Sequence, residues 1–195
     1  MNYSALEDIK VYSNLETSKK INPFHDFGHL ERVNRNADLI VEILGLKNDL
    51  DINLLHAACY LHDIPVNVSK KYFLGDLGKH IFEKEIIKKY LPNILDNFSL
   101  TQHDKNVLYK IIFNHPFSIP YRHLNKDRGI YTKILQDADS LDYFSFERQN
   151  NLKIIGSTSL LYSVLSKLTG LYFLIGRKII RLFLNFPNIA SINYN

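Results

Sequence analysis

Apolar residues recur at intervals of three and four along the first strongly patterned segment of the chain. The residues that repeat in this way are Leu30, Val33, Ala37, Ile40 and Leu44. This spacing predicts an amphipathic helix with one buried face. Asp26 precedes the pattern as a good N-cap residue, and Gly45 follows it at a position where glycine commonly ends a helix.

A second segment is apolar on nearly all sides, which is typical of a central buried helix. Its apolar residues are Leu54, Leu55, Ala57, Ala58, Tyr60 and Leu61. Asp51 is the expected N-cap of this helix. Because Pro65 disfavours helical geometry at the residue before it, we expect the helix to end at His62 and Asp63.

The rest of the chain is also patterned as helices. Further helices are expected near residues 77–91, 103–114 and 131–145, with two or more between 157 and 186. Segments 66–76 and 116–129 carry Gly, Pro, Asn and charged residues between them, and predict loops. No strand alternation persists, so the pattern predicts an all-α fold. The length of 195 residues favours a single domain over residues 1–195.

Composition places the chain among ordinary globular proteins, with 46% hydrophobic and 23% charged residues. Cys59 is the single cysteine, so no internal disulfide can form, and we interpret it as a small buried apolar residue. The first ten residues lack the basic start and apolar stretch of a signal peptide. We therefore expect a cytoplasmic protein.

The net charge of +4 is unevenly distributed, because no acidic residue follows Glu147 while five basic residues lie between 153 and 181. We expect apolar helices near 157–186 to pack on the core and to leave a solvated basic edge. Contact of segment 153–181 with nucleic acid or a membrane surface is the less favoured interpretation. Within the apolar run 160–186, the longest uncharged piece, 168–176, is too short to cross a bilayer.

Four residues stand out as candidate metal ligands: His29, His62, Asp63 and Asp139. Imidazole and carboxylate groups are good ligands for divalent metals. An apolar helix that ends in His62 and Asp63 is costly unless these groups are paired or bound. Both can reach one ion only if the backbone unwinds there, since adjacent helical side chains diverge by about 100°.

Segment 135–142 places Asp139 close to a buried face marked by Leu135, Ala138 and Leu141. A location at the protein surface fits Asp137 and Asp142 better than it fits Asp139. His29 lies in the first turn of its predicted helix and is expected to point toward the edge of the core.

Three segments together resemble the HD-domain metal-dependent phosphohydrolase superfamily. Segment 25–33, HDFGHLERV, resembles its opening H-x-x-R-V motif, and segment 57–64, AACYLHDI, resembles its A-A-x-L-H-D-I signature. Segment 137–142, DADSLD, resembles its closing D-A-D-x-L-D. The resemblance implies a helical bundle with a core of about 20–148 and a metal site at converging helix ends. It implies His29, His62, Asp63 and Asp139 as the metal ligands, and it selects His29 over His25.

Two further histidines, His80 and His115, also lie at predicted helix ends. Some branches of the superfamily have histidines at similar places, which bind a second metal or the substrate phosphate, so both are candidate site residues. The remaining ones, His25, His56, His103 and His123, are interpreted as surface, core or loop residues.

The predicted activity is metal-dependent hydrolysis of phosphate esters or anhydrides, with a nucleotide or another small phosphorylated metabolite as substrate. Asp63 is the expected catalytic residue, because it could hold the metal and also orient the attacking water. Arg32 and Lys79 are candidates for binding phosphate. Mn²⁺, Fe²⁺, Co²⁺, Mg²⁺ and Zn²⁺ all remain open, as does the choice between one ion and two.

Departures from the superfamily keep two other functions open. No acidic residue follows shortly after Asp63, and the G-Y-P signature of the cyclic-dinucleotide phosphodiesterases is missing. A non-catalytic sensor module that binds metal or nucleotide is one alternative. A di-iron oxygenase is the other, because a few HD-like proteins with extra histidines use paired iron and dioxygen.

Overall fold

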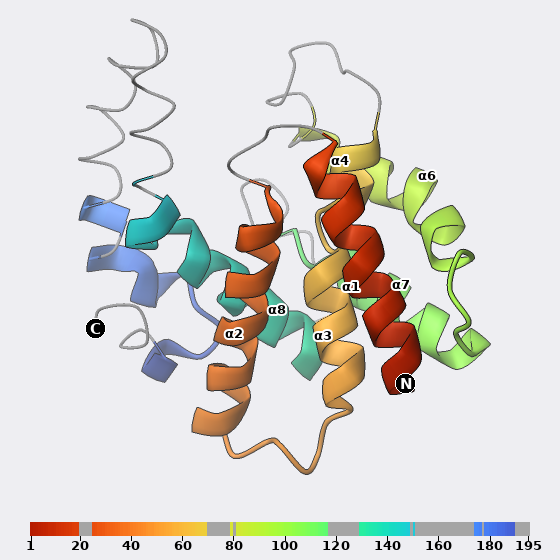
Figure 1. Cartoon of the computed structure of the whole chain (residues 1–195). Helices are drawn as coiled ribbons and strands as arrows, with labels where there is room; N and C mark the ends of the chain where they lie inside the picture. The colour runs from red at the N-terminus through yellow and green to blue at the C-terminus, as the bar shows by residue number, and fades with distance from the viewer. Residues whose placement is uncertain are drawn as a thin grey trace, which may run out of the picture.

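The computed structural model describes residues 1–19, 25–69, 79, 81–116, 129–148, 150, 174–176 and 178–189. Within these residues every regular element is a helix, so the all-α prediction is confirmed. The helices are α1 (Tyr3–Ser18), α2 (Phe27–Ile43), α3 (Ile52–Leu61), α4 (Ile64–Val68), α6 (Glu83–Leu95), α7 (Gln102–Asn114), α8 (Ile130–Tyr143) and the 3-10 helix η2 (Ile180–Leu182). Helix α3 packs against α1, α2 and α7, and α8 packs against α2 (Figure 1).

Helix α2 forms as its sequence pattern predicts. The side chain of Asp26 accepts a hydrogen bond from the His29 backbone N–H at 2.7 Å and caps the helix. The apolar stripe from Leu30 to Ile40 is fully buried. Gly45 then adopts a φ of +67°, a left-handed conformation that glycine reaches without strain, and the helix ends there.

Helix α3 ends at Leu61, with His62 as its C-cap, as expected from the proline that follows. The expectation for Ile64 is wrong, however, because Ile64 is the first residue of the short helix α4. Pro65 lies in the first turn of α4, where a missing N–H costs no hydrogen bond. The chain therefore turns sharply at His62 and Asp63 and resumes a helix at once.

The predicted bounds of the other helices and loops agree with the structure in some places and differ in others. Helices α7 and α8 match their expected ranges, whereas α6 lies a few residues later than 77–91. The loop expected over 66–76 begins later, because α4 continues to Val68. The hydrophobic pattern did not single out α1, whose Ala5, Leu6 and Ile9 are buried. The segments expected at 116–129 and 157–186 lie mostly outside the described residues.

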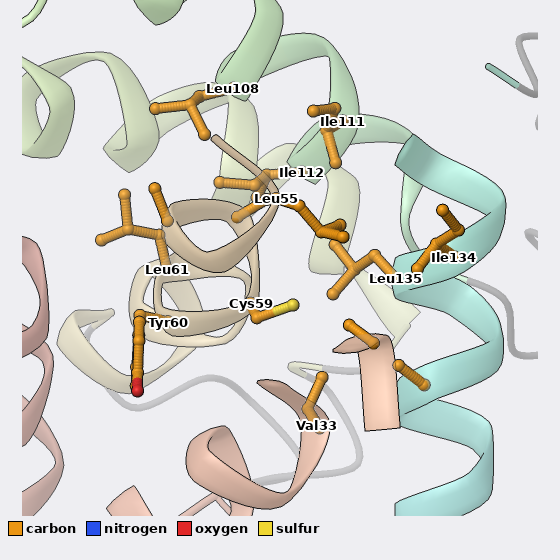
Figure 2. Packing of buried hydrophobic residues seen from close by; sticks show 14 of the residues in the cluster. Val33, Leu55, Cys59, Tyr60, Leu61, Leu108, Ile111, Ile112, Ile134 and Leu135 are labelled. Atoms are coloured by element: carbon orange, nitrogen blue, oxygen red, sulfur yellow. The ribbon is translucent and has the colours of Figure 1, made fainter. Parts of the chain in front are cut away.

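The hydrophobic core lies between α2, α3, α7 and α8 (Figure 2). Cys59 is buried there as expected, and burial raises the pKa of its thiol. Ile180, Leu184 and Ile189 belong to the same core. The predicted packing of helices near 157–186 as a whole stays a prediction, because most of that range lies outside the described residues. None of the helices that the structure describes has the length and apolar character to cross a membrane.

Asp137 anchors this C-terminal segment to α8. Its Oδ1 accepts a hydrogen bond from the Asn185 backbone N–H and its Oδ2 accepts one from the Phe186 backbone N–H, both at 2.8 Å. The carboxyl group is fully buried, so its predicted surface location is wrong. Burial raises the pKa of Asp137 to about 6, although the hydrogen bonds from Asn185 and Phe186 oppose this shift.

Replacing Asp137 with Asn should destabilise the fold. The amide turns an NH₂ group toward a backbone N–H, which leaves a buried donor without an acceptor. We expect the free energy of unfolding to fall by about 1–3 kcal/mol in urea denaturation followed by circular dichroism. Asp8→Asn, which changes an exposed acid on α1, serves as the control. Equal urea midpoints for the two variants would contradict this role of Asp137.

Candidate metal centre

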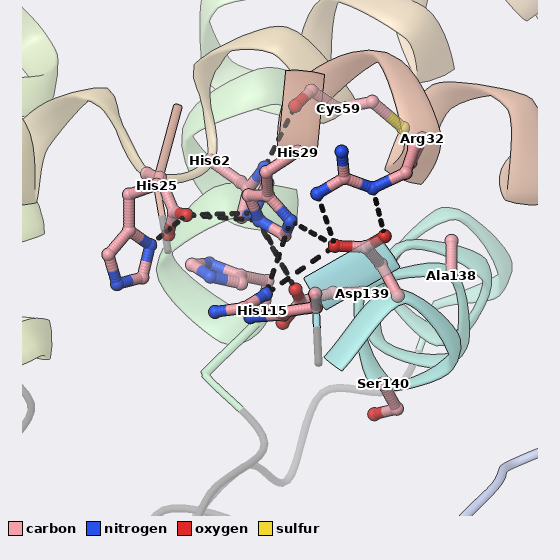
Figure 3. Close-up of polar contacts among 12 residues, drawn as sticks. His25, His29, Arg32, Cys59, His62, His115, Ala138, Asp139 and Ser140 are labelled. Carbon is pink, nitrogen blue, oxygen red and sulfur yellow. Dashed lines mark hydrogen bonds and ion pairs between the residues drawn. The ribbon is translucent and has the colours of Figure 1, made fainter. Parts of the chain in front are cut away.

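Four helix ends meet at one place in the bundle. His29 lies in the first turn of α2, and His62 and Asp63 form the junction of α3 and α4. His115 is the C-cap of α7, and Asp139 lies in the last turns of α8. Figure 3 shows the side chains of His29, His62, His115 and Asp139 pointing toward one another. Residues up to 110 positions apart in the sequence thus share one cluster.

Nε2 of His29 and Nε2 of His62 each lie close to both Asp63 and Asp139. Nε2 of His29 lies 3.3 Å from Nε2 of His62, 3.2 Å from Oδ2 of Asp63 and 3.5 Å from Oδ1 of Asp139. Nε2 of His62 lies 3.4 Å from Oδ2 of Asp63 and 4.0 Å from Oδ1 of Asp139. Bonds of about 2.0–2.2 Å to a shared cation place neighbouring ligand atoms roughly 3.0–3.5 Å apart. The distance from His62 to Asp139 exceeds this range, and the other four lie within it, so the cluster could hold a divalent metal.

The same local hydrogen bond orients two of the histidines. His62 and His115 are both helix C-caps, and each donates its Nδ1–H to the carbonyl three residues earlier. The acceptors are Cys59 at 2.8 Å and Ile112 at 2.7 Å. Each bond uses a carbonyl in the last turn of its helix, and it leaves the Nε2 lone pair facing the cluster. The Ile112 carbonyl also accepts a hydrogen bond from the His115 backbone N–H at 3.4 Å. The helix ends therefore prepare both rings to bind a metal.

His29 is held by a carboxylate instead. Its Nδ1 lies 2.7 Å from Oδ2 of Asp142, a pairing common behind metal-binding histidines. Burial opposes the charged imidazolium, but the hydrogen bonds that it donates to Asp142 and Asp63 raise the pKa of His29 to about 9. A metal at Nε2 would therefore replace a firmly held proton.

Asp142 corrects the sequence prediction, because it is fully buried whereas the Asp139 side chain is 34% exposed. Two arginines offset its charge. Nε of Arg32 donates to Oδ1 at 2.6 Å, and Nη1 of Arg148 lies 3.5 Å from Oδ2. Burial works against ionisation, yet hydrogen bonds from His29 and Arg32 hold the pKa of Asp142 well below its usual range.

Arg32 and Lys79, the two predicted phosphate ligands, both contact protein groups. Arg32 is not an ordinary solvated charge, since its side chain is 13% exposed and pairs with Asp142. Nζ of Lys79 donates to the Val66 carbonyl at 3.2 Å. Binding of phosphate by these two residues stays a prediction. His80 lies outside the described residues.

Three residues of the cluster were not predicted as site residues from the sequence. Nδ1 of His25 lies 2.6 Å from Oδ2 of Asp63, so the interpretation of His25 as a residue outside the site is wrong. Arg148 lies behind His29, with Nη1 3.3 Å from its Nδ1. Glu83 lies beside His115 and is 6% exposed. The four-residue spacing of His25 and His29 was the available signal for the first, whereas no local pattern marks Glu83.

Ligand atoms in the described residues form three overlapping groups, each within 4.8 Å. The groups are His25, His29 and Asp63; His29, His62 and Asp139; and His62, Asp63 and His115. His115 thus joins the cluster, whereas His56 pairs with Asp38 at the surface. Burial opposes ionisation of Asp63, but the neighbouring His62 and His25 hold its pKa well below the usual range. The buried groups could hold one metal ion or more.

Comparison with known proteins points to one family. A family model described as the HD domain matches residues 26–143. The matched segment contains His29, His62, Asp63 and Asp139, and it extends over α2 to α8. No curated protein and no solved structure matches the chain.

The contact between Asp142 and His29 predicts a measurable effect on metal binding. Asp142→Asn weakens the partner that orients His29, so we expect Mn²⁺ affinity to fall by about 10- to 100-fold in calorimetric titration. Asp38→Asn changes a carboxylate that pairs with a surface histidine, and it should bind Mn²⁺ like the wild type. Circular dichroism confirms that each variant is folded. An unchanged affinity in folded Asp142→Asn protein would refute the orienting role.

Proposed function

Because this chain belongs to the HD-domain family, we propose that it is a metal-dependent hydrolase of phosphate esters or anhydrides. The proposed substrate is a nucleotide or a similar small phosphorylated metabolite. The observation that carries the proposal is the convergence of two Nε2 atoms and two carboxylates from separate helices. Membership of the family supports the reaction class, and the geometry of the cluster supports a metal site.

We propose His29, His62, Asp63 and Asp139 as the metal ligands. A bound divalent cation lowers the pKa of water and polarises a phosphoryl oxygen. Two imidazoles beside two carboxylates suit Mn²⁺, Fe²⁺, Co²⁺ and Zn²⁺ better than Mg²⁺, which prefers oxygen ligands. The partly exposed side chain of Asp139 lies on the accessible side of the cluster, which supports substrate entry from there.

Asp63 is the proposed catalytic residue. Its low pKa keeps the carboxylate ionised at neutral pH, so that it can accept a hydrogen bond from water and orient it. His25 contacts Oδ2 of Asp63 at 2.6 Å, and the His25 carbonyl accepts a hydrogen bond from Nδ2 of Asn67 at 3.3 Å. These contacts support a role of His25 in fixing the orientation of Asp63.

Four further predictions accompany this proposal. We propose that residues 1–195 form a single HD-type domain and that the protein is cytoplasmic. Arg32 and Lys79 remain candidate phosphate ligands, although Arg32 would have to share its guanidinium with Asp142. Contact with nucleic acid or membrane surfaces through segment 153–181 stays the less favoured interpretation.

A di-iron oxygenase is the second candidate function. The additional histidine beside His62 and Asp63 favours it, because His115 enlarges the ligand set beyond the four that one ion requires. Oxygen consumption with Fe²⁺ separates this activity from phosphate release. A sensor module would bind its ligand without turnover.

The proposal predicts phosphate or pyrophosphate release that depends on metal. Metal-stripped protein should hydrolyse members of a panel of nucleotides and phosphorylated metabolites after addition of Mn²⁺, Fe²⁺, Co²⁺, Mg²⁺ or Zn²⁺. Asp63→Ala should lower kcat by about 100- to 10,000-fold, because it removes the group that orients water. Asp49→Ala, which changes an exposed acid, is the control. Absence of turnover with every metal, despite tight metal binding, would reject the hydrolase.

A further inference from the structure

The side chain of Asn185 links the C-terminal segment to α8 beyond its docking on Asp137. Its Nδ2 donates to Oδ1 of Asp137 at 2.9 Å, to Oε1 of Gln136 at 3.1 Å and to the Lys133 carbonyl at 3.4 Å. The backbone N–H groups of Asn185 and Phe186 already bind the Asp137 carboxylate. The bond to Gln136 is therefore not required for docking, and it leads from the segment into the bundle.

Gln136 extends this contact to α7. The residue is 1% exposed, and its Nε2 donates to the Asn114 carbonyl at 2.9 Å. Asn114 is the last residue of α7, where carbonyls have no partner within the helix. Because Oε1 of Gln136 accepts the hydrogen bond from Asn185, the amide presents Nε2 to α7. Asn185 thus fixes the direction in which Gln136 donates.

The carbonyl that Gln136 binds is adjacent to His115, the C-cap of α7. His115 is 3% exposed, and its ring meets the ring of His62 edge to face, with the ring centroids 5.1 Å apart (Figure 3). The bond from Nδ1–H to the Ile112 carbonyl fixes how the ring is turned relative to α7. It does not fix where the end of α7 lies relative to α8. The bond from Gln136 to Asn114 supplies this second constraint.

We propose that Gln136 and Asn185 are positioning residues of the metal centre, which hold the imidazole of His115 in place through the Asn114 carbonyl. This relay, from Asn185 to Gln136 to Asn114, joins the C-terminal segment to the candidate site. Its effect on catalysis rests on the proposed function, whereas its effect on the orientation of the ring does not. The C-terminal segment then contributes to the geometry of the site as well as to the hydrophobic core.

The competing explanation is that these hydrogen bonds serve stability alone, because they satisfy a buried amide and the end of a helix. Two variants interrupt the relay at different bonds. Gln136→Met keeps an unbranched side chain of similar length without the amide, and Asn185→Ala keeps the backbone N–H that binds Asp137. Because both variants break the same path, their effects on the His115 ring should not add in the double variant.

The readout is the imidazole ring of His115 in the full chain. Protein with isotope-labelled histidine is stripped of metal, and long-range nuclear magnetic resonance correlations report the protonation and environment of each ring nitrogen. His115→Gln identifies the His115 signals. Burial lowers the pKa of His115 to about 4, so its ring is neutral at neutral pH.

We expect the wild type to show a neutral His115 ring with a slowly exchanging Nδ1–H. The matched control Asn188→Ala changes an exposed asparagine of the same segment and should give the same signals. Gln136→Met and Asn185→Ala should shift the signals of the ring nitrogens and speed the exchange of this proton. Thermal unfolding confirms that each protein is folded at the temperature of the measurement.

Turnover is measured on the same proteins after loading with Mn²⁺, with the phosphorylated compound that the wild type hydrolyses fastest. We expect kcat to fall by about 10- to 100-fold in Gln136→Met and in Asn185→Ala, with little further loss in the double variant. KM should change less than kcat, because the relay acts on the metal centre. Asn188→Ala should keep the kcat of the wild type.

Unchanged ring signals in folded Gln136→Met and Asn185→Ala would overturn the inference, as would altered signals at the kcat of the wild type. Altered ring signals together with a lower kcat would support it. Altered ring signals in both variants of a protein that hydrolyses no phosphate would support the relay and reject the hydrolase. Phosphate release with unchanged ring signals in both variants would leave the proposed function standing and reject the relay.

Discussion

The buried carboxylate of Asp142 is the interaction on which both the fold and the site depend. It contacts His29 and Arg32 of α2 across more than 100 residues of sequence, and Arg148 lies against it from the segment after α8. A charge in the interior is tolerable only with such compensation, and two arginines provide it. The same contacts that join α2 to α8 also set the orientation of His29. Stability and ligand geometry therefore cannot be changed separately at this position.

Helix ends set the orientation of the imidazole rings of His62 and His115. His62 and His115 each donate the Nδ1–H to the carbonyl three residues earlier, in the last turn of the helix. This hydrogen bond also fixes the orientation of the imidazole ring. Proline follows each of them closely, at 65 and 116. Pro65 lies in the first turn of the next helix, α4, so it is the short break at His62 and Asp63 that separates α3 from α4. Local backbone chemistry thus gives two ligands a fixed direction without requiring a dedicated side-chain partner.

The sequence predicted the features that local patterns encode. Periodicity and caps predicted α2, and the proline predicted the end of α3 at His62 and Asp63. Local patterns do not show which distant residues balance the charge of a buried carboxylate or donate hydrogen bonds to it. The sequence favoured a surface location for Asp142, whereas the structure places Arg32 and Arg148 around its buried carboxylate. It also favoured a surface location for Asp137, whose buried carboxylate accepts hydrogen bonds from Asn185 and Phe186. Glu83 likewise acquires significance only through His115, since nothing in the pattern of α6 distinguishes it from Glu85.

The docking of Asn185 and Phe186 onto Asp137 has a consequence for the order of events during protein synthesis. Helix α8 is translated well before these residues, yet its buried carboxyl group finds its backbone donors only among them. A nascent chain that ends before residue 186 would have to bury Asp137 with incomplete hydrogen bonding, which is unfavourable. The segment that carries Asp139 and Asp142 should therefore reach its final packing only after Asn185 and Phe186 have left the ribosome.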